Sequence, residues 1–110
     1  MAEFLVTEAE QGERFAPRVG DEILLQLPEN PSTGYRWAID RLDEDRVNLV
    51  DSGFRAEGPA TGSGGAAFWR LRMQNAGRTR IELKRWRAFE GETSVVERFA
   101  FDLEIEPGSP

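Results

Sequence analysis

Two residue types with strong chemical roles, cysteine and histidine, are absent from this chain of 110 residues. Without cysteine there is no disulfide framework, and without either residue there is no zinc site of the usual kind. The same absences remove the thiolate nucleophile and the imidazole base on which many hydrolases depend. The serines therefore have no histidine to activate them, and Lys84 is the sole lysine. We expect the protein not to be an enzyme and to use no metal ion or cofactor.

Basic charge and long apolar runs are also scarce. The chain has 14 basic residues against 20 acidic ones, and its net charge of −6 argues against nucleic acid as a partner. No apolar run approaches the roughly 20 residues that cross a bilayer, so no membrane partner is expected. The N-terminus, MAEFL, has neither a basic start nor an apolar stretch. This predicts a cytoplasmic protein if the chain as given is full length, and a periplasmic or secreted one if an export signal was removed.

Alternation of apolar and polar residues dominates what the sequence does contain. The clearest example covers residues 67–73 (AFWRLRM), a pattern typical of a half-buried strand. Similar patterns cover 23–27, 35–39, 79–83 and 99–105, and shorter ones cover 4–7 and 47–54, with a break expected at Gly53. Helix is scarce, with one turn expected at 41–46. Turn residues separate the strands, which predicts an all-β sandwich or barrel. We expect a single domain over residues 1–110, with its core at 4–105 and a frayed tail at 106–110.

Residues 30–34 (NPSTG) form the first of three unusual loops. Pro31 fixes its own φ angle, and Gly34 admits a positive φ. The segment therefore predicts a stiff loop that presents two small hydroxyl groups and is tied to the core by Tyr35 and Trp37. A tight connection between strands with no partner is the alternative that these residues alone leave open.

The second loop, residues 58–65 (GPATGSGG), has four glycines in eight residues. Glycine-rich loops that bind phosphate are followed by a helix, whereas the next segment here alternates like a strand. A flexible hairpin tip is therefore the better interpretation of this stretch by itself.

The third loop, residues 86–91 (WRAFEG), ends the strand that contains Leu83. Large aromatic residues and arginine beside a turn are typical of protein-binding hot spots. Burial of Trp86 or Phe89 against the end of the core would explain the same residues equally well.

In their order and spacing the three loops resemble those of the chagasin family, whose members inhibit papain-type cysteine proteases. The family pattern is Asn-Pro-Thr-Thr-Gly-aromatic, then Gly-x-Gly-Gly, then Arg-Pro followed by Trp or Phe. The resemblance extends from about Phe4 to Ile105. It implies an immunoglobulin-like β-sandwich of about seven to eight antiparallel strands, with the functional loops clustered at one end. It also implies a reversible, tight-binding inhibitor whose three loops wedge into the active-site cleft of a papain-family cysteine protease.

The resemblance also implies which residues bind the protease. The first motif, expected beside the catalytic cysteine, falls on Asn30, Pro31, Ser32, Thr33 and Gly34. The second, expected against the enzyme surface to one side, falls on Gly62, Ser63, Gly64 and Gly65. The third, expected on the other side, falls on Trp86, Arg87, Ala88 and Phe89, with either aromatic as the contact.

Two of these residues depart from the family pattern. Ser32 replaces threonine and keeps the hydroxyl group, whereas Ala88 replaces proline and removes a rigid residue. The alternative function is an immunoglobulin-like binding module for another protein or a carbohydrate, without protease inhibition. We expect a monomer, with a weak dimer through exposed edge strands as the alternative.

Overall fold

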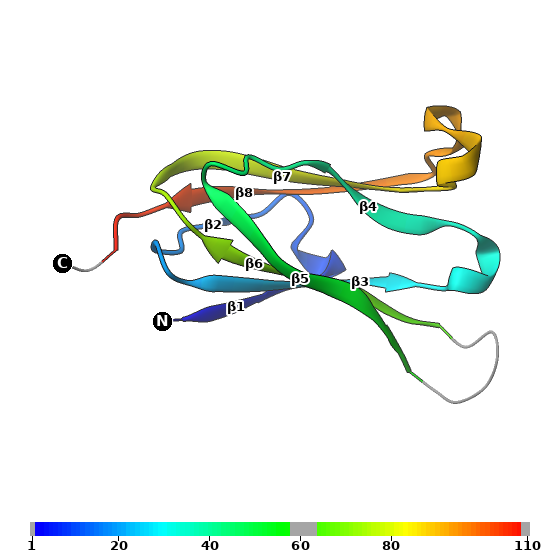
Figure 1. The fold of residues 1–110 in the computed structure, drawn as a ribbon, viewed down its shortest axis with the longest axis horizontal. Coiled ribbons are helices and arrows are strands. Elements are labelled where there is room, and N and C mark those ends of the chain that lie inside the picture. The colour runs from blue at the N-terminus through cyan, green and yellow to red at the C-terminus, as the bar shows by residue number, and fades with distance from the viewer. Residues whose placement is uncertain (1, 58–63, 109–110) are drawn as a thin grey trace.

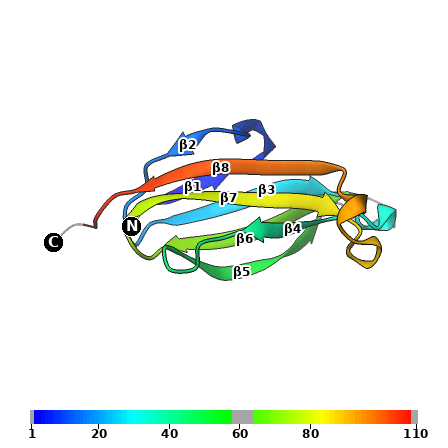
Figure 2. The same cartoon turned by 90° about the horizontal axis from the view of Figure 1, so that it is seen from above.

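The computed structural model describes residues 2–57 and 64–108, and nearly all of its regular structure is β-strand (Figure 1). Eight strands form two four-stranded sheets, with the strand orders β1-β3-β6-β5 and β2-β8-β7-β4. The two sheets lie face to face, as Figures 1 and 2 show from two directions. The predicted sandwich is therefore confirmed. The strands are β1 (Glu3–Val6), β2 (Arg14–Phe15), β3 (Glu22–Glu29), β4 (Arg36–Arg41), β5 (Val47–Ala56), β6 (Gly65–Met73), β7 (Gly77–Trp86) and β8 (Glu97–Ile105).

Alternate residues of the central strands build the core between the sheets. In β6 the buried residues are Ala67, Trp69, Leu71 and Met73, as the alternation predicted. Phe99, Phe101, Leu103 and Ile105 play the same part in β8 and face them from the other sheet. Burial of each large apolar side chain among them favours folding by about 1.5–3 kcal/mol. These central strands are therefore the stable part of the fold from which the loops project.

Strand direction differs from the expectation at one edge of each sheet. β1 pairs with β3 and β2 pairs with β8 in parallel, while all the other strand pairs in the described residues are antiparallel. Parallel neighbours need a long crossover connection. The segment 7–21 provides one between β1 and β3, and it contains a short 3-10 turn, η1 (Glu8–Glu10), and β2.

The expected break at Gly53 is wrong, because β5 runs without interruption through this residue and pairs with β6 along its length. A β-carbon at Gly53 would lie 2.9 Å from the ring of Phe68. Glycine therefore makes room for an aromatic side chain here. The irregularity in β5 lies between Leu49 and Asp51, where the register shifts.

Helical structure in the described residues is limited to short turns. Besides η1, three 3-10 turns occur: η2 (Pro31–Thr33), η3 (Ala88–Glu90) and η4 (Glu92–Ser94). The helical turn expected at 41–46 is a hydrogen-bonded turn, in which Arg46 N–H donates to the Asp43 carbonyl at 3.0 Å. Across residues 2–57 and 64–108, no helix has both the length and the apolarity needed to cross a bilayer.

Three connections meet at one end of the sandwich. The β3–β4 connection with η2, the β7–β8 connection with η3 and η4, and the described ends of β5 and β6 all lie on the right in Figure 1. The β4–β5 and β6–β7 turns lie at the opposite end. The fold thus brings together the first and third loops singled out in the sequence and the described strand ends that flank the second.

Candidate functional site

Asn30 organises the first loop. Its side-chain oxygen Oδ1 accepts hydrogen bonds from the Ser32 N–H at 3.1 Å and from the Ser32 hydroxyl at 2.7 Å. This is the usual way in which an asparagine caps a helical turn. Pro31 occupies the first position of η2, where its missing N–H leaves no hydrogen bond unmade. Cap and proline together hold Ser32 in one orientation.

Thr33 and Gly34 end the turn. The Thr33 hydroxyl donates to the Asn30 carbonyl at 2.9 Å and accepts from the Tyr35 N–H at 3.2 Å. Gly34 has a φ of 80°, in the left-handed region that favours glycine. The stiff loop predicted from the sequence is therefore a single 3-10 turn, and internal hydrogen bonds fix its two hydroxyl groups. Ser32 and Thr33 both remain exposed on the surface.

Arg87 joins the third loop to the first. Its guanidinium Nη2 donates to the Thr33 carbonyl at 3.0 Å, and its central carbon lies 4.2 Å from the ring centroid of Tyr35. The same guanidinium forms an ion pair with Glu90 at 3.1 Å. Arg87 thus lies between the two loops and contacts both, next to the point where Arg36 of β4 pairs with Trp86 of β7.

The Ser94 hydroxyl closes the third loop upon itself. Ser94 Oγ accepts a hydrogen bond from the Arg87 N–H at 3.0 Å. It also lies 2.9 Å from the Arg87 carbonyl and 2.6 Å from the Gly91 carbonyl, and it can donate its proton to either. The segment 87–94 is therefore cross-linked at its base. No pattern in the sequence pointed to this role for Ser94, because a serine in a turn has many possible partners.

Lys84 fastens the same segment to the sheet. Its ammonium group forms ion pairs with Asp40 of β4 at 3.1 Å and with Glu92 of η4 at 2.8 Å, and it lies 3.8 Å from the ring centroid of Trp86. Arg98 of β8 bridges the same two carboxylates at 3.2 and 3.5 Å. The hydrogen bond between Lys84 and Glu92 raises the pKa of Lys84 and lowers the pKa of Glu92. The sequence shows that Lys84 is the sole lysine, but it does not identify the partners of its ammonium group.

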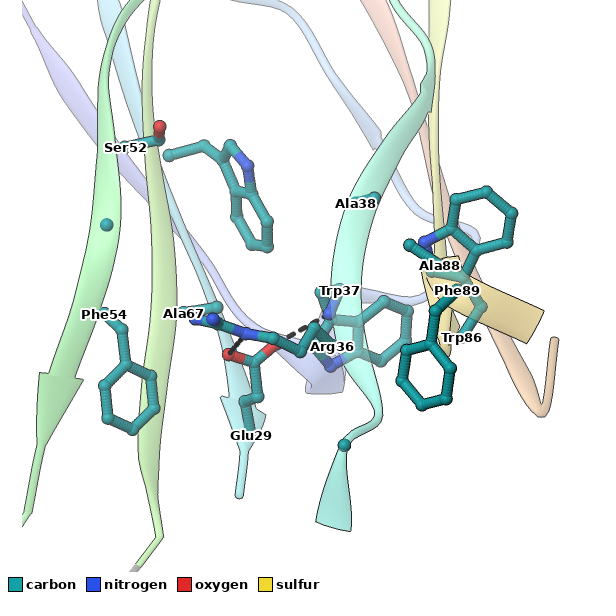
Figure 3. Close-up of a pocket in the computed structure, with 13 residues that line it drawn as sticks. Glu29, Arg36, Trp37, Ala38, Ser52, Phe54, Ala67, Trp86, Ala88 and Phe89 are labelled. Atoms are coloured by element: carbon teal, nitrogen blue, oxygen red, sulfur yellow. Dashed lines mark hydrogen bonds and ion pairs between the residues drawn. The ribbon is translucent and has the colours of Figure 1, made fainter. Parts of the chain in front are cut away.

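The two aromatic residues of the third loop differ in exposure. Phe89 is 80% exposed, whereas Trp86 is partly buried and covered by Lys84. Beside them, a groove of about 610 Å³ opens between β4 and β5, with Phe54, Trp37 and Phe89 among its lining residues (Figure 3). Of the two candidate contacts, Phe89 has the more exposed ring, and both Trp86 and Phe89 line the groove.

Part of the second motif lies at the same end. Gly65 pairs with Glu29 of β3 and with Ala56 of β5, and a β-carbon on it would collide with the Arg55 carbonyl. Glycine is thus required at this position by close packing of the backbone. Gly64 precedes it directly, whereas Gly62 and Ser63 lie outside the described residues. Among the described residues, no group of three or more acidic side chains could hold a metal ion.

Comparison with known proteins identifies the family. The Chagasin family peptidase inhibitor I42 matches residues 17–105. This protein belongs to the chagasin family. Its sequence is 27% identical over 103 residues to chagasin from Trypanosoma cruzi, covering 89% of this chain and 94% of that protein. Family membership confirms the resemblance drawn from the three loops. The family is one of peptidase inhibitors and not of enzymes.

Solved structures agree with this membership. The cysteine protease inhibitor EhICP2 from Entamoeba histolytica superposes with a TM-score of 0.88 at 28% identity, covering 96% of this chain and 97% of that one. PbICP-C, solved in complex with falcipain-2, superposes with a TM-score of 0.63 over 96% of this chain and 99% of that one. At 11% identity, PbICP-C shows the chagasin-like fold alone.

Proposed function

We propose that this chagasin-family protein is a reversible, tight-binding inhibitor of papain-family cysteine proteases, which it blocks by placing its loop end in the active-site cleft. The observation that carries the proposal is the contact of Arg87 with both Thr33 and Tyr35, because it makes one rigid, projecting surface from two separate loops. Chagasin-family membership supports inhibition, and the name of EhICP2 supports cysteine proteases as the target class.

A protein that fills a protease cleft without being cleaved must keep its peptide carbonyls away from the catalytic thiolate. The η2 turn meets this requirement, because its compact 3-10 backbone differs from the extended form in which peptide substrates bind. The hydrogen bond that Asn30 Oδ1 accepts from Ser32 and the one that the Thr33 hydroxyl donates to the Asn30 carbonyl already hold the turn before binding. Little conformational entropy is then lost on docking, which favours high affinity.

We assign the remaining contacts by exposure and position. Phe89 presents an exposed ring beside η2 and serves as the aromatic anchor of the third loop. Ala88 lies next to Phe89. The Trp86 ring packs against Lys84, which in turn is paired with Glu92 of the same loop. The glycines of the second loop contact the enzyme on the other side of η2. For Gly62 and Ser63 this assignment rests on the family motif.

The experiment that tests the proposal is inhibition of papain by the purified protein. We expect a sub-micromolar inhibition constant, the usual range for a rigid inhibitor with an interface of standard size. Exchange of both Ser32 and Thr33 for arginine is expected to abolish inhibition while the far-ultraviolet circular dichroism stays unchanged, since both side chains are exposed. Replacement of Phe89 by alanine is expected to weaken inhibition more than replacement of Trp86.

A control is Gln74→Arg, which adds one arginine, half the charge of the double variant, in the exposed turn at the opposite end of the sandwich. This variant is expected to inhibit like the unchanged protein. Full papain activity at an inhibitor concentration of tens of micromolar, roughly a hundred times the expected constant, would refute the proposal. It would leave a binding module for another partner as the remaining function.

A further inference from the structure

The first loop has an unusual structural problem at its base. It leaves β3 in one sheet and enters β4 in the other, and these two strands do not pair with each other. In an ordinary hairpin, the ladder of backbone hydrogen bonds holds both ends of the loop. Here each end is held within its own sheet, Glu29 by pairing with Gly65 and Arg36 by pairing with Trp86, so other interactions must join the two ends to each other.

A buried carboxylate supplies that interaction. Glu29, the last residue of β3, is 6% exposed, and its Oε1 accepts a hydrogen bond of 2.6 Å from the Trp37 backbone N–H in β4. Its other oxygen, Oε2, forms an ion pair with Arg36 Nε at 3.4 Å. Figure 3 shows the carboxylate between the two strands with both interactions drawn. A second bond runs the opposite way, from the Trp37 indole N–H to the Pro28 carbonyl at 3.0 Å.

Glu29 also fixes the position of the second loop. Its backbone pairs with Gly65, the first residue of β6, at the point where the second loop enters the sheet. The backbone of one residue therefore aligns the second loop, while its side chain aligns the first. Neither the family motif nor any pattern in the sequence assigned a role to this glutamate.

We propose that Glu29 is a positioning residue for inhibition: its carboxylate closes the base of the first loop and sets the direction in which η2 projects. The effect on inhibition rests on the function proposed above. A buried carboxylate is expensive to desolvate, and an apolar residue in its place would not carry that cost. An apolar residue would, however, leave the Trp37 N–H buried without an acceptor and remove one of the two hydrogen bonds that join Trp37 to β3. Charge-assisted hydrogen bonds are shorter and stronger than neutral ones, which suits a glutamate to this position.

Three variants separate the parts of this interaction. Glu29→Ala removes both bonds of the carboxylate, while Glu29→Gln keeps an oxygen that can accept from Trp37 and loses the charge that faces Arg36. Arg36→Gln removes only the ion pair, whose arginine side chain is 60% exposed. Two readouts apply to each: the dissociation rate of the papain complex, and the hydrogen exchange rate of the Trp37 amide in the free protein.

We expect dissociation to be about tenfold faster for Glu29→Ala, the effect of losing one buried charged hydrogen bond. Glu29→Gln should fall between Glu29→Ala and the unchanged protein, and Arg36→Gln should change dissociation about twofold, as for an exposed pair. Trp37 amide exchange should accelerate in the same order. Two controls accompany them. Glu44→Gln removes one negative charge at the far end, and Val47→Ala destabilises the buried far end of β5 without touching the loops.

The outcomes distinguish positioning from general stability. Dissociation as slow in Glu29→Ala as in the unchanged protein would overturn the proposal, and so would equal acceleration by Val47→Ala at a matched melting temperature. If the unchanged protein does not inhibit papain, the proposed function fails. Trp37 amide exchange then decides by itself whether Glu29 closes the loop, since it needs no protease.

Discussion

Replacement of Arg87 by alanine is the sharpest test of how the loop end works. The family motif places this arginine among the residues that face the protease. Its guanidinium is nevertheless engaged within the inhibitor, with Thr33, Tyr35 and Glu90. If Arg87 acts mainly as a brace between loops, its loss should allow η2 and η3 to move independently and should speed dissociation of the protease complex.

The size of this effect follows from the three contacts. A hydrogen bond to a charged group contributes about 1.5–3 kcal/mol when well buried. The Arg87 side chain is 35% exposed, so we take the lower end for its bond to Thr33. The cation–π contact with Tyr35 adds about 0.5–1 kcal/mol, and the exposed pair with Glu90 adds little. The total of about 2 kcal/mol corresponds to roughly thirtyfold faster dissociation.

Surface plasmon resonance with immobilised, inactivated papain measures the dissociation rate directly. Arg78→Ala is the matched control, because Arg78 is also paired with a carboxylate but lies on an exposed strand end away from the loops. A double-mutant cycle with Tyr35→Leu then isolates the brace. An Arg87→Ala effect of the same size with and without the Tyr35 ring would contradict the contribution assigned to the cation–π contact, and an effect no larger than that of Arg78→Ala would contradict the brace as a whole.

Two further predictions concern the third loop. Ala88→Pro restores the family residue at the first position of η3, where proline is well tolerated, and should stabilise the protein by about 0.4–1 kcal/mol; a lower melting temperature by calorimetry would show that the backbone at residue 88 does not suit proline. The pKa of Glu92 is lowered chiefly by its hydrogen bond with Lys84, so its contribution to stability is complete above the ordinary value of 4.5 and is lost as the pH falls through its folded pKa. The pKa of Lys84 is raised, so its contribution is complete below 10.5 and is lost at still higher pH. Urea unfolding across both ranges should therefore depend less on pH in Lys84→Gln than in the unchanged protein, and equal dependence would mean that the pair does not stabilise the fold.

The sequence was sufficient to predict the strands whose two faces differ in polarity. In β6 and β8 the inward residues of 67–73 and 99–105 are all apolar and most of them are large, so alternation gave both the strand and its buried face. β5 is harder, since most of its residues are exposed on the edge of a sheet. Gly53 suggested a break in this strand. The reason for a glycine here is its contact with the ring of Phe68, which is distant in sequence and visible only in the structure.

Side-chain partners between strands could not be predicted, since they depend on which sheet each strand joins. By alternation alone, Arg70 and Arg72 could line up with Arg78 and Arg80 on one sheet face. They lie in different sheets, with Arg70 and Arg72 paired to Glu22 of β3. The partners of Lys84 were hidden for the same reason, because Asp40 and Glu92 come from β4 and η4. Local turn chemistry, by contrast, placed the capped first loop correctly.

The placement of these partners explains how the loop end can be rigid without the family proline. The first loop connects β3 and β4, which lie in different sheets and do not pair with each other. No ladder of backbone hydrogen bonds therefore joins the two ends of this loop, and side chains hold it both there and at its tip. Glu29 does so at the base of the first loop, and Arg87 does so where the first and third loops meet. In the third loop, Ser94 and the Lys84–Glu92 pair restrain the segment in which Ala88 stands for proline. Rigidity that proline would supply within the backbone is here supplied by hydrogen bonds and ion pairs, which makes it sensitive to pH and salt.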